Sequence, residues 1–250
     1  FTLTAGGAVT DSAATVVNNL NVTAGGAVTL DFATNNAANL FVSAAGQTLT
    51  YRDADGLNLA GVTADTFNLQ TGGAVTDSLA TIATNLNLIS TGGVTLDVAT
   101  NDVDNINVSA AGQTVAFTDV DGINFAGINA GTFTAIAGGA VTDSVATTAT
   151  NLNVTSTGAV TLDNANDVTN LFVSAAGQTV TYNDTNALNL AGVTAATFNL
   201  TTGGALTDTL ATIVTDLNVT AGGIVTLDTA TNNAANLNIN AGANNITYVD

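Results

Sequence analysis

The sequence predicts an all-β protein, a parallel β-helix (β-solenoid) built from 66-residue repeats of about three coils each. One phrase returns four times along the chain, apolar and polar residues alternate with period two, and pairs of small residues separate the alternating runs. Fixed-period self-similarity is the signature of a repeat architecture rather than of a closed globule. We therefore expect residues 1–250 to form one β-solenoid segment that is part of a longer array.

The repeats are defined by a recurring seven-residue phrase. "GGAVTDS" occurs at Gly6, Gly72 and Gly138, and returns as "GGALTDT" at Gly203. The aligned repeats cover residues 1–66, 67–132, 133–197 and 198–250, and the last one is incomplete. A solenoid places equivalent residues above one another, and this stacking selects for repetition.

Within the first repeat, the alternating runs begin at Phe1, Leu20, Leu40 and Leu57. In "LNVT" and "AVTLD", the apolar residues fall on one face of a strand and Asn, Thr and Asp on the other. A helix is not expected, because Thr, Val, Asn and Gly are poor helix formers and the 3.6-residue period is missing. The run that begins at Leu57 is shorter than the others, so we expect it to extend one coil and each repeat to contain three coils. Four small coils per repeat is the alternative.

The glycine pair and the residues after it are expected to form a corner followed by a strand. Gly6 and Gly7 are predicted to turn the chain with positive φ, which costs glycine little. Val9 then points inward, and the strand ends at Asp11, which accepts backbone N–H groups of the next bend. The repeated aromatic residues are expected to be stacked in the core: Phe1, Phe67, Phe133, Phe198, Tyr51, Phe117, Tyr182 and Tyr248.

The composition limits the partners. Acidic residues number 19, all of them Asp, and Arg52 is the only Lys or Arg, so the formal net charge is −18. No basic patch can form, so we expect no nucleic-acid partner. No apolar run is long enough for a transmembrane helix, and we expect no membrane insertion. The expected partners are neighbouring repeats or copies of the chain stacked end to end, and a cell-surface glycan or protein target is left open.

The residue types also argue against catalysis and cofactors. His and Cys are absent, as are Lys and Glu, which removes the commonest general bases and nucleophiles, so we expect no enzyme and no catalytic residues. The one motif with ligand chemistry is "RDADG" at 52–56, echoed by "TDVDG" and "NDTNA". Two carboxylates and a turn glycine can collect oxygen ligands for Ca²⁺, although an Asx turn favours the same residues. The calcium candidates are Asp53, Asp55, Asp119, Asp121, Asp184 and Asn186.

The phrases "NLNVTAGGAVTLD", "NLFVSAAGQTVTYND" and "LNLAGVTAATFNLTTGGALTD" resemble the repeats of filamentous-haemagglutinin-like exoproteins, which bacteria export by two-partner secretion, and of autotransporter passengers. The resemblance implies an extracellular or cell-surface structural protein, the rod-like shaft of an adhesin or a segment of a filament. A protomer that polymerises end to end through open β-edges is the alternative. Ice binding through the threonines of 48–50 and 179–181, and polysaccharide degradation on a β-helix, are weaker alternatives.

Overall fold

The computed structural model describes residues 1–250 and contains strands and turns but no helix. It consequently has no helix long and apolar enough to cross a membrane. The chain divides into two compact units, unit 1 (Phe1–Ile123) and unit 2 (Asn124–Asp250). Each unit is a stack of parallel β-coils, which confirms the predicted β-solenoid.

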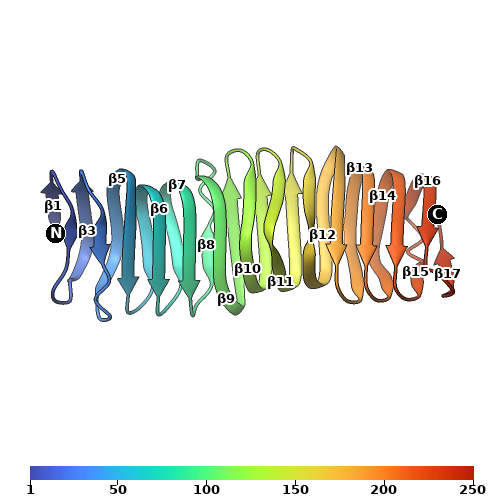
Figure 1. The fold of residues 1–250 in the computed structure, drawn as a ribbon, viewed down its shortest axis with the longest axis horizontal. Coiled ribbons are helices and arrows are strands. Elements are labelled where there is room, and N and C mark those ends of the chain that lie inside the picture. The colour runs from blue at the N-terminus through green and yellow to red at the C-terminus, as the bar shows by residue number, and fades with distance from the viewer. The chain divides into compact units, whose positions relative to one another are not determined.

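Unit 1 contains the first nine strands. In chain order they are β1 (Thr2–Ala5), β2 (Val9–Thr10), β3 (Val16–Ala24), β4 (Val28–Leu30), β5 (Asn36–Asp53), β6 (Leu57–Thr71), β7 (Val75–Ser90), β8 (Val94–Leu96) and β9 (Asp102–Asp119). The pairings of β5 with β6 and of β6 with β7 are parallel. In Figure 1 these three strands lie side by side and their arrows point the same way.

Unit 2 follows the same plan. Its strands are β10 (Ile123–Ala137), β11 (Val141–Ser156), β12 (Val160–Asp184), β13 (Leu188–Thr202), β14 (Leu206–Ala221), β15 (Val225–Leu227), β16 (Asn233–Asn240) and β17 (Ile246–Tyr248). The β12–β13 and β13–β14 pairings are parallel, as are β14–β16 and β15–β17. The neighbours β12, β13 and β14 can be followed in Figure 1.

A repeat does not contain a whole number of coils. Val9 pairs with Val28 in the next coil, Val28 pairs with Leu49, and Leu49 pairs with Phe67. Three coils therefore carry the chain from Val9 to Phe67, whereas the repeat equivalent of Val9 is Val75, which lies further along the chain. Each repeat thus contains three coils and part of a fourth, so equivalent residues of successive repeats do not stack on one another.

The core lies inside the coils, as the alternation predicted. Leu20, Val22, Val28 and Leu30 are buried, with at most 5% of each residue exposed. Burial of such side chains stabilises the fold by roughly 25 cal/mol per Å² of apolar surface removed from water. Column by column, the interior is a stack of branched aliphatic side chains with occasional aromatic rings.

The aromatic residues are mostly buried, but they do not stack on one another as predicted. Phe67 lies between Leu49 and Leu86 because the coil and the repeat differ in length. The only aromatic ring pair is an edge-to-face contact between Phe125 and Phe133, whose centroids are 5.1 Å apart. Six of the eight predicted core aromatics are buried, whereas Phe1 is 63% exposed and Tyr248 is half-buried.

The glycine pairs serve a different purpose from the one predicted. Positive φ is confined to single glycines such as Gly46 and Gly61, and neither Gly6 nor Gly7 has it. The pairs are instead required where one coil lies on another: a Cβ on Gly25 would come within 2.6 Å of the Gly6 carbonyl oxygen. The missing side chain therefore permits close backbone stacking, and the prediction of positive φ at Gly6 and Gly7 was wrong.

This interpretation predicts different effects at two glycines that occupy the same repeat position. In Gly72→Ala, the new methyl group overlaps the carbonyl group of Ala54 in the preceding coil, which costs about 1–3 kcal/mol of unfolding free energy. In Gly6→Ala, the methyl group meets no atom within 4 Å. Urea unfolding followed by circular dichroism measures both, and equal losses would show that stacking is not what demands glycine.

Candidate functional site

The acidic turns predicted to bind calcium begin with a buried carboxylate. Asp53, Asp119 and Asp184 end β5, β9 and β12 and are 2%, 3% and 1% exposed. In each, Oδ1 accepts the backbone N–H two residues on, at 2.9–3.1 Å, which forms an Asx turn. Oδ2 accepts a second backbone N–H, from Ala37, Val103 or Val168 respectively, at 2.9–3.0 Å.

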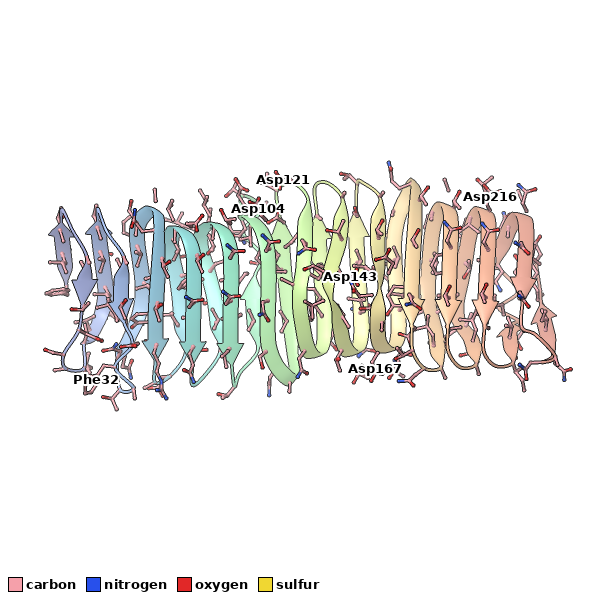
Figure 2. All side chains as sticks on the ribbon, viewed as in Figure 1. Phe32, Asp104, Asp121, Asp143, Asp167 and Asp216 are labelled. Atoms are coloured by element: carbon pink, nitrogen blue, oxygen red, sulfur yellow. The ribbon has the colours of Figure 1, made fainter.

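The second residue of each turn points away from the first. Asp55, Asp121 and Asn186 are exposed, and Asp121 projects outward in Figure 2. Asp55 accepts a hydrogen bond from the Asn36 amide at 2.7 Å, and the Asn186 amide donates to Asp167 at 3.0 Å. Because one carboxylate of each turn faces inward and is saturated by N–H donors, the six candidates do not converge on a point. No group of three or more carboxylates is placed to hold a metal ion.

One difference among the three turns is a hydroxyl group beside the buried carboxylate. The Tyr51 hydroxyl donates to Asp53 Oδ2 at 2.9 Å, and the Tyr182 hydroxyl donates to Asp184 Oδ2 at 3.2 Å. Burial, followed by the adjacent carboxylate, raises the pKa of both tyrosines, so they remain protonated donors. In the middle turn Phe117 stands at this position, and burial raises the pKa of Asp119 to about 7, with smaller contributions from a side-chain hydrogen bond with Asp121 and from its charge. Burial also raises the pKa of Asp184, and the hydrogen bond from Tyr182 opposes that rise.

A second polar network, which recurs in all four repeats, joins successive coils from inside. Each copy contains an asparagine that is at most 3% exposed. Its Oδ1 accepts a backbone N–H of the preceding coil at 2.7–2.8 Å, and its Nδ2 donates to an aspartate at 2.7–3.2 Å. The asparagine and aspartate pairs are Asn35 with Asp11, Asn101 with Asp77, Asn166 with Asp143, and Asn232 with Asp208.

The role predicted for Asp11 is confirmed only in part, because the aspartates at the same position of the later repeats, Asp77, Asp143 and Asp208, lie inside β7, β11 and β14. The strand β2 ends at Thr10, and Asp11 Oδ2 accepts the backbone N–H of Phe32, 3.2 Å away in the next bend. The buried asparagines were not predicted. Their only signal is position, because Asn35 stands at a fixed place in the repeat although its neighbour Asn36 points outward.

The outer face carries ladders of asparagine side chains. The Asn39 amide donates to Asn19 at 2.9 Å, and the Asn58 amide donates to Asn39 at 2.8 Å. In unit 2, Asn170 donates to Asn151 and Asn189 donates to Asn170, both at 3.0 Å. Each of these bonds connects one coil to the next, so together they align the outward side chains along the stack.

The threonine runs considered for ice binding lie on the outside, but they are not repeated in the next coil. Thr48 and Thr50 pair with Thr66 and Asn68. Equivalent pairing in unit 2 sets Thr179 and Thr181 against Thr197 and Asn199. A face with two threonines in each of successive coils is therefore not formed at these positions.

Each unit also has an outward groove at the same place in the repeat pattern. In unit 2 the groove has a volume of about 550 Å³ and is lined by asparagine and threonine side chains of β12, β13, β14 and β16. In unit 1 the groove is about 320 Å³ and contains Arg52 and Asp31. These grooves and the acidic turns are the places where the chain presents grouped polar side chains.

The acidic turns give a prediction about calcium. Because the inward carboxylates already accept N–H groups, millimolar CaCl₂ is expected to leave the Tm of the chain unchanged relative to EDTA. Differential scanning calorimetry at constant ionic strength, with MgCl₂ as the control, measures this. A calcium-specific rise in Tm would show that the turns bind calcium.

The middle turn gives a prediction about pH. In the folded state Asp119 keeps its proton up to about pH 7. In the unfolded chain it loses the proton near pH 4, the ordinary value for an aspartate. The contribution of Asp119 to the unfolding free energy therefore falls as the pH rises from about 4 to about 7. Phe117→Tyr adds a hydroxyl donor to the carboxylate, which lowers the pKa of Asp119. At pH 8 the variant is expected to be more stable by about 1.5–3 kcal/mol, and the gain is expected to shrink at pH 4.5.

Urea unfolding of Phe117→Tyr and of the parent chain at both pH values measures the gain, because the other aspartates cancel in the difference. Tyr182→Phe is the matched control, since it removes the hydroxyl that donates to Asp184 and should destabilise the chain most at pH 8. A gain that is the same at pH 4.5 and pH 8 would contradict titration of Asp119 as its cause.

Comparison with known proteins identifies one family. Its model, described as repeats of unknown function (DUF5649), matches residues 1–44, 46–110, 112–175 and 177–240. The matches have the period of the predicted repeats but a different starting point, since the second, third and fourth begin at the positive-φ glycines Gly46, Gly112 and Gly177. No curated protein and no solved structure matches the chain.

The resemblance to filamentous-haemagglutinin-like and autotransporter repeats is not supported by these comparisons and stays a prediction. What they do support is a set of four copies of one repeat, each of which folds into β-coils. The chain therefore belongs to the family of repeats of unknown function (DUF5649).

Proposed function

We propose that the chain is a non-catalytic structural segment of an extracellular or cell-surface protein, in which the β-coils act as a stiff spacer. The observation that carries this proposal is the parallel backbone pairing of each coil with the next along the strands of each unit. No long loop interrupts the coils in either unit, although binding and catalytic residues are typically carried by such loops. The sequence is thus devoted to maintaining the coil.

The chemistry of the surface supports the same function. Threonine and asparagine are frequent among the outward side chains, although apolar ones such as Leu79, Ile89 and Leu210 are exposed as well. The net charge of −18 keeps neighbouring molecules apart in solution. Absence of Cys means that the fold does not depend on disulfide formation or on the redox state of its surroundings. His, Lys and Glu, the usual proton-transfer groups besides Asp, are also absent.

The location can be tested by labelling intact source cells. An antibody raised against the 250-residue chain is expected to stain unpermeabilised cells, and external protease is expected to remove the signal. A cytoplasmic protein of the same cells is the control for leakage. Staining that requires permeabilisation would refute an extracellular location.

The alternative, a filament protomer that stacks end to end, predicts a different assembly state. Analytical ultracentrifugation of the purified chain over a hundredfold concentration range separates the two. A monomer at all concentrations supports the spacer, whereas growth into long polymers, visible by negative-stain electron microscopy, supports the filament.

A further inference from the structure

The groove of unit 2 is lined by two rows of outward side chains that follow the stacking of four coils. Parallel pairing sets Thr181, Asn199, Asn218 and Asn238 in one row and Asn183, Thr201, Thr220 and Asn240 in the other. Neighbours in a row are about 4.8 Å apart, and the rows are separated by two positions along the strand, about 6.7 Å. The array therefore extends about 14 Å along the stack.

Most of the hydrogen-bonding capacity of this array is free. The Asn218 amide donates to Asn199 at 3.0 Å, which orients both amide groups. The Asn183 amide donates to the backbone of Asp163, and Asn240 accepts a bond from Gly242. The remaining side chains, which make no hydrogen bond to the protein, are Thr181, Thr201, Thr220 and Asn238. Amide and hydroxyl groups together offer donors and acceptors side by side.

This mixture selects the chemistry of a ligand. A phosphate or carboxylate ligand needs cationic donors, which the groove lacks, and the charge of the chain opposes it. A cationic ligand would need more than the one carboxylate at the edge, Asp163. Saccharide hydroxyls are uncharged and each can donate and accept, so they match an array in which donors and acceptors alternate at short intervals.

The groove of unit 1 provides an internal comparison. Its first row is retained as Thr50, Asn68 and Asn87, but its second row is Arg52, Gln70 and Ile89. The second row thus replaces short polar groups with a cation, a longer amide and an apolar side chain. The uncharged array of amides and hydroxyls is complete only in unit 2.

We propose that the groove of unit 2 is a binding site for a neutral oligosaccharide that lies along β12, β13, β14 and β16. The two rows hold the saccharide through its hydroxyl groups, and the asparagine pair Asn199 and Asn218 is pre-oriented for this contact by its own hydrogen bond. The proposal does not depend on the spacer function, because it concerns the outward side chains of the groove and not the backbone pairing that makes the coil.

The test uses the 250-residue chain and neutral hexasaccharides of known composition: cellohexaose, xylohexaose, mannohexaose and chitohexaose. Hexagalacturonate serves as the anionic probe. Isothermal titration calorimetry is expected to detect binding of at least one neutral hexasaccharide and weaker or no binding of hexagalacturonate. Failure of all four neutral probes at millimolar concentration, or preference for hexagalacturonate, would overturn the proposal.

The double variant Thr201→Val and Thr220→Val removes two hydroxyls from the second row while keeping the shape and strand preference of the side chains. It is expected to weaken binding about tenfold or more, with an unchanged Tm. The matched control is Thr148→Val with Thr155→Val, two exposed threonines of β11 outside the groove. Arg52→Asn in the groove of unit 1 is expected to leave binding unchanged. Equal affinity of the groove variant and the parent chain, or a loss caused by Arg52→Asn, would refute this location.

Discussion

The close approach of one coil to the next is the constraint on which the rest of the structure depends. Parallel backbone pairing sets a spacing of about 4.8 Å between coils, and at the corners this spacing leaves no room for a side chain between two backbones. Gly25 and Gly73 show the consequence, since a Cβ on either would come within 3 Å of backbone atoms of the neighbouring coil. The same spacing aligns Leu on Val inside and Asn on Asn outside, so core, corner and surface all follow from one distance.

Polar groups inside the coils are tolerated because they are hydrogen-bonded to backbone N–H groups. Asn101 accepts the N–H of Thr81 and donates to Asp77, and Asp119 accepts two backbone N–H groups. A buried polar group without a partner destabilises a fold, whereas one that is bonded on both sides joins the elements it contacts. The acidic turns are thus best understood as parts of the coil, with a cost that varies according to whether a tyrosine hydroxyl is present.

Much of the fold was predictable because the coil leaves a direct trace in the sequence. Period-two alternation identified Leu20, Val22, Val28 and Leu30 as inward, and the recurrence of "GGAVTDS" identified a stacked architecture.

The function of the glycine pairs was not predictable from local preferences, since positive φ and close stacking both favour glycine. Buried Asn35 could not be predicted for a related reason: in a chain rich in outward asparagines, residue type does not distinguish an inward one.

The groove of unit 2 could not be recognised either, because Thr181, Asn199 and Asn218 lie in successive coils and only the register shows that they are neighbours. The calcium prediction was based on the spacing in "RDADG", which does not reveal that Asp53 is buried at the end of β5 whereas Asp55 is exposed in the turn that follows.

The mismatch between the length of a coil and the length of a repeat has a consequence for the packing of the core. Because each copy starts part of a turn further around the coil, Val28, Leu49, Phe67 and Leu86 share one column although they come from different places in the repeat. Each inward position therefore packs against residues from other places in the repeat. The pairs that meet are set by the length of a coil and recur in a later repeat, as Leu57 with Val75 and Leu188 with Leu206 show, so one sequence motif fills several different columns of the core.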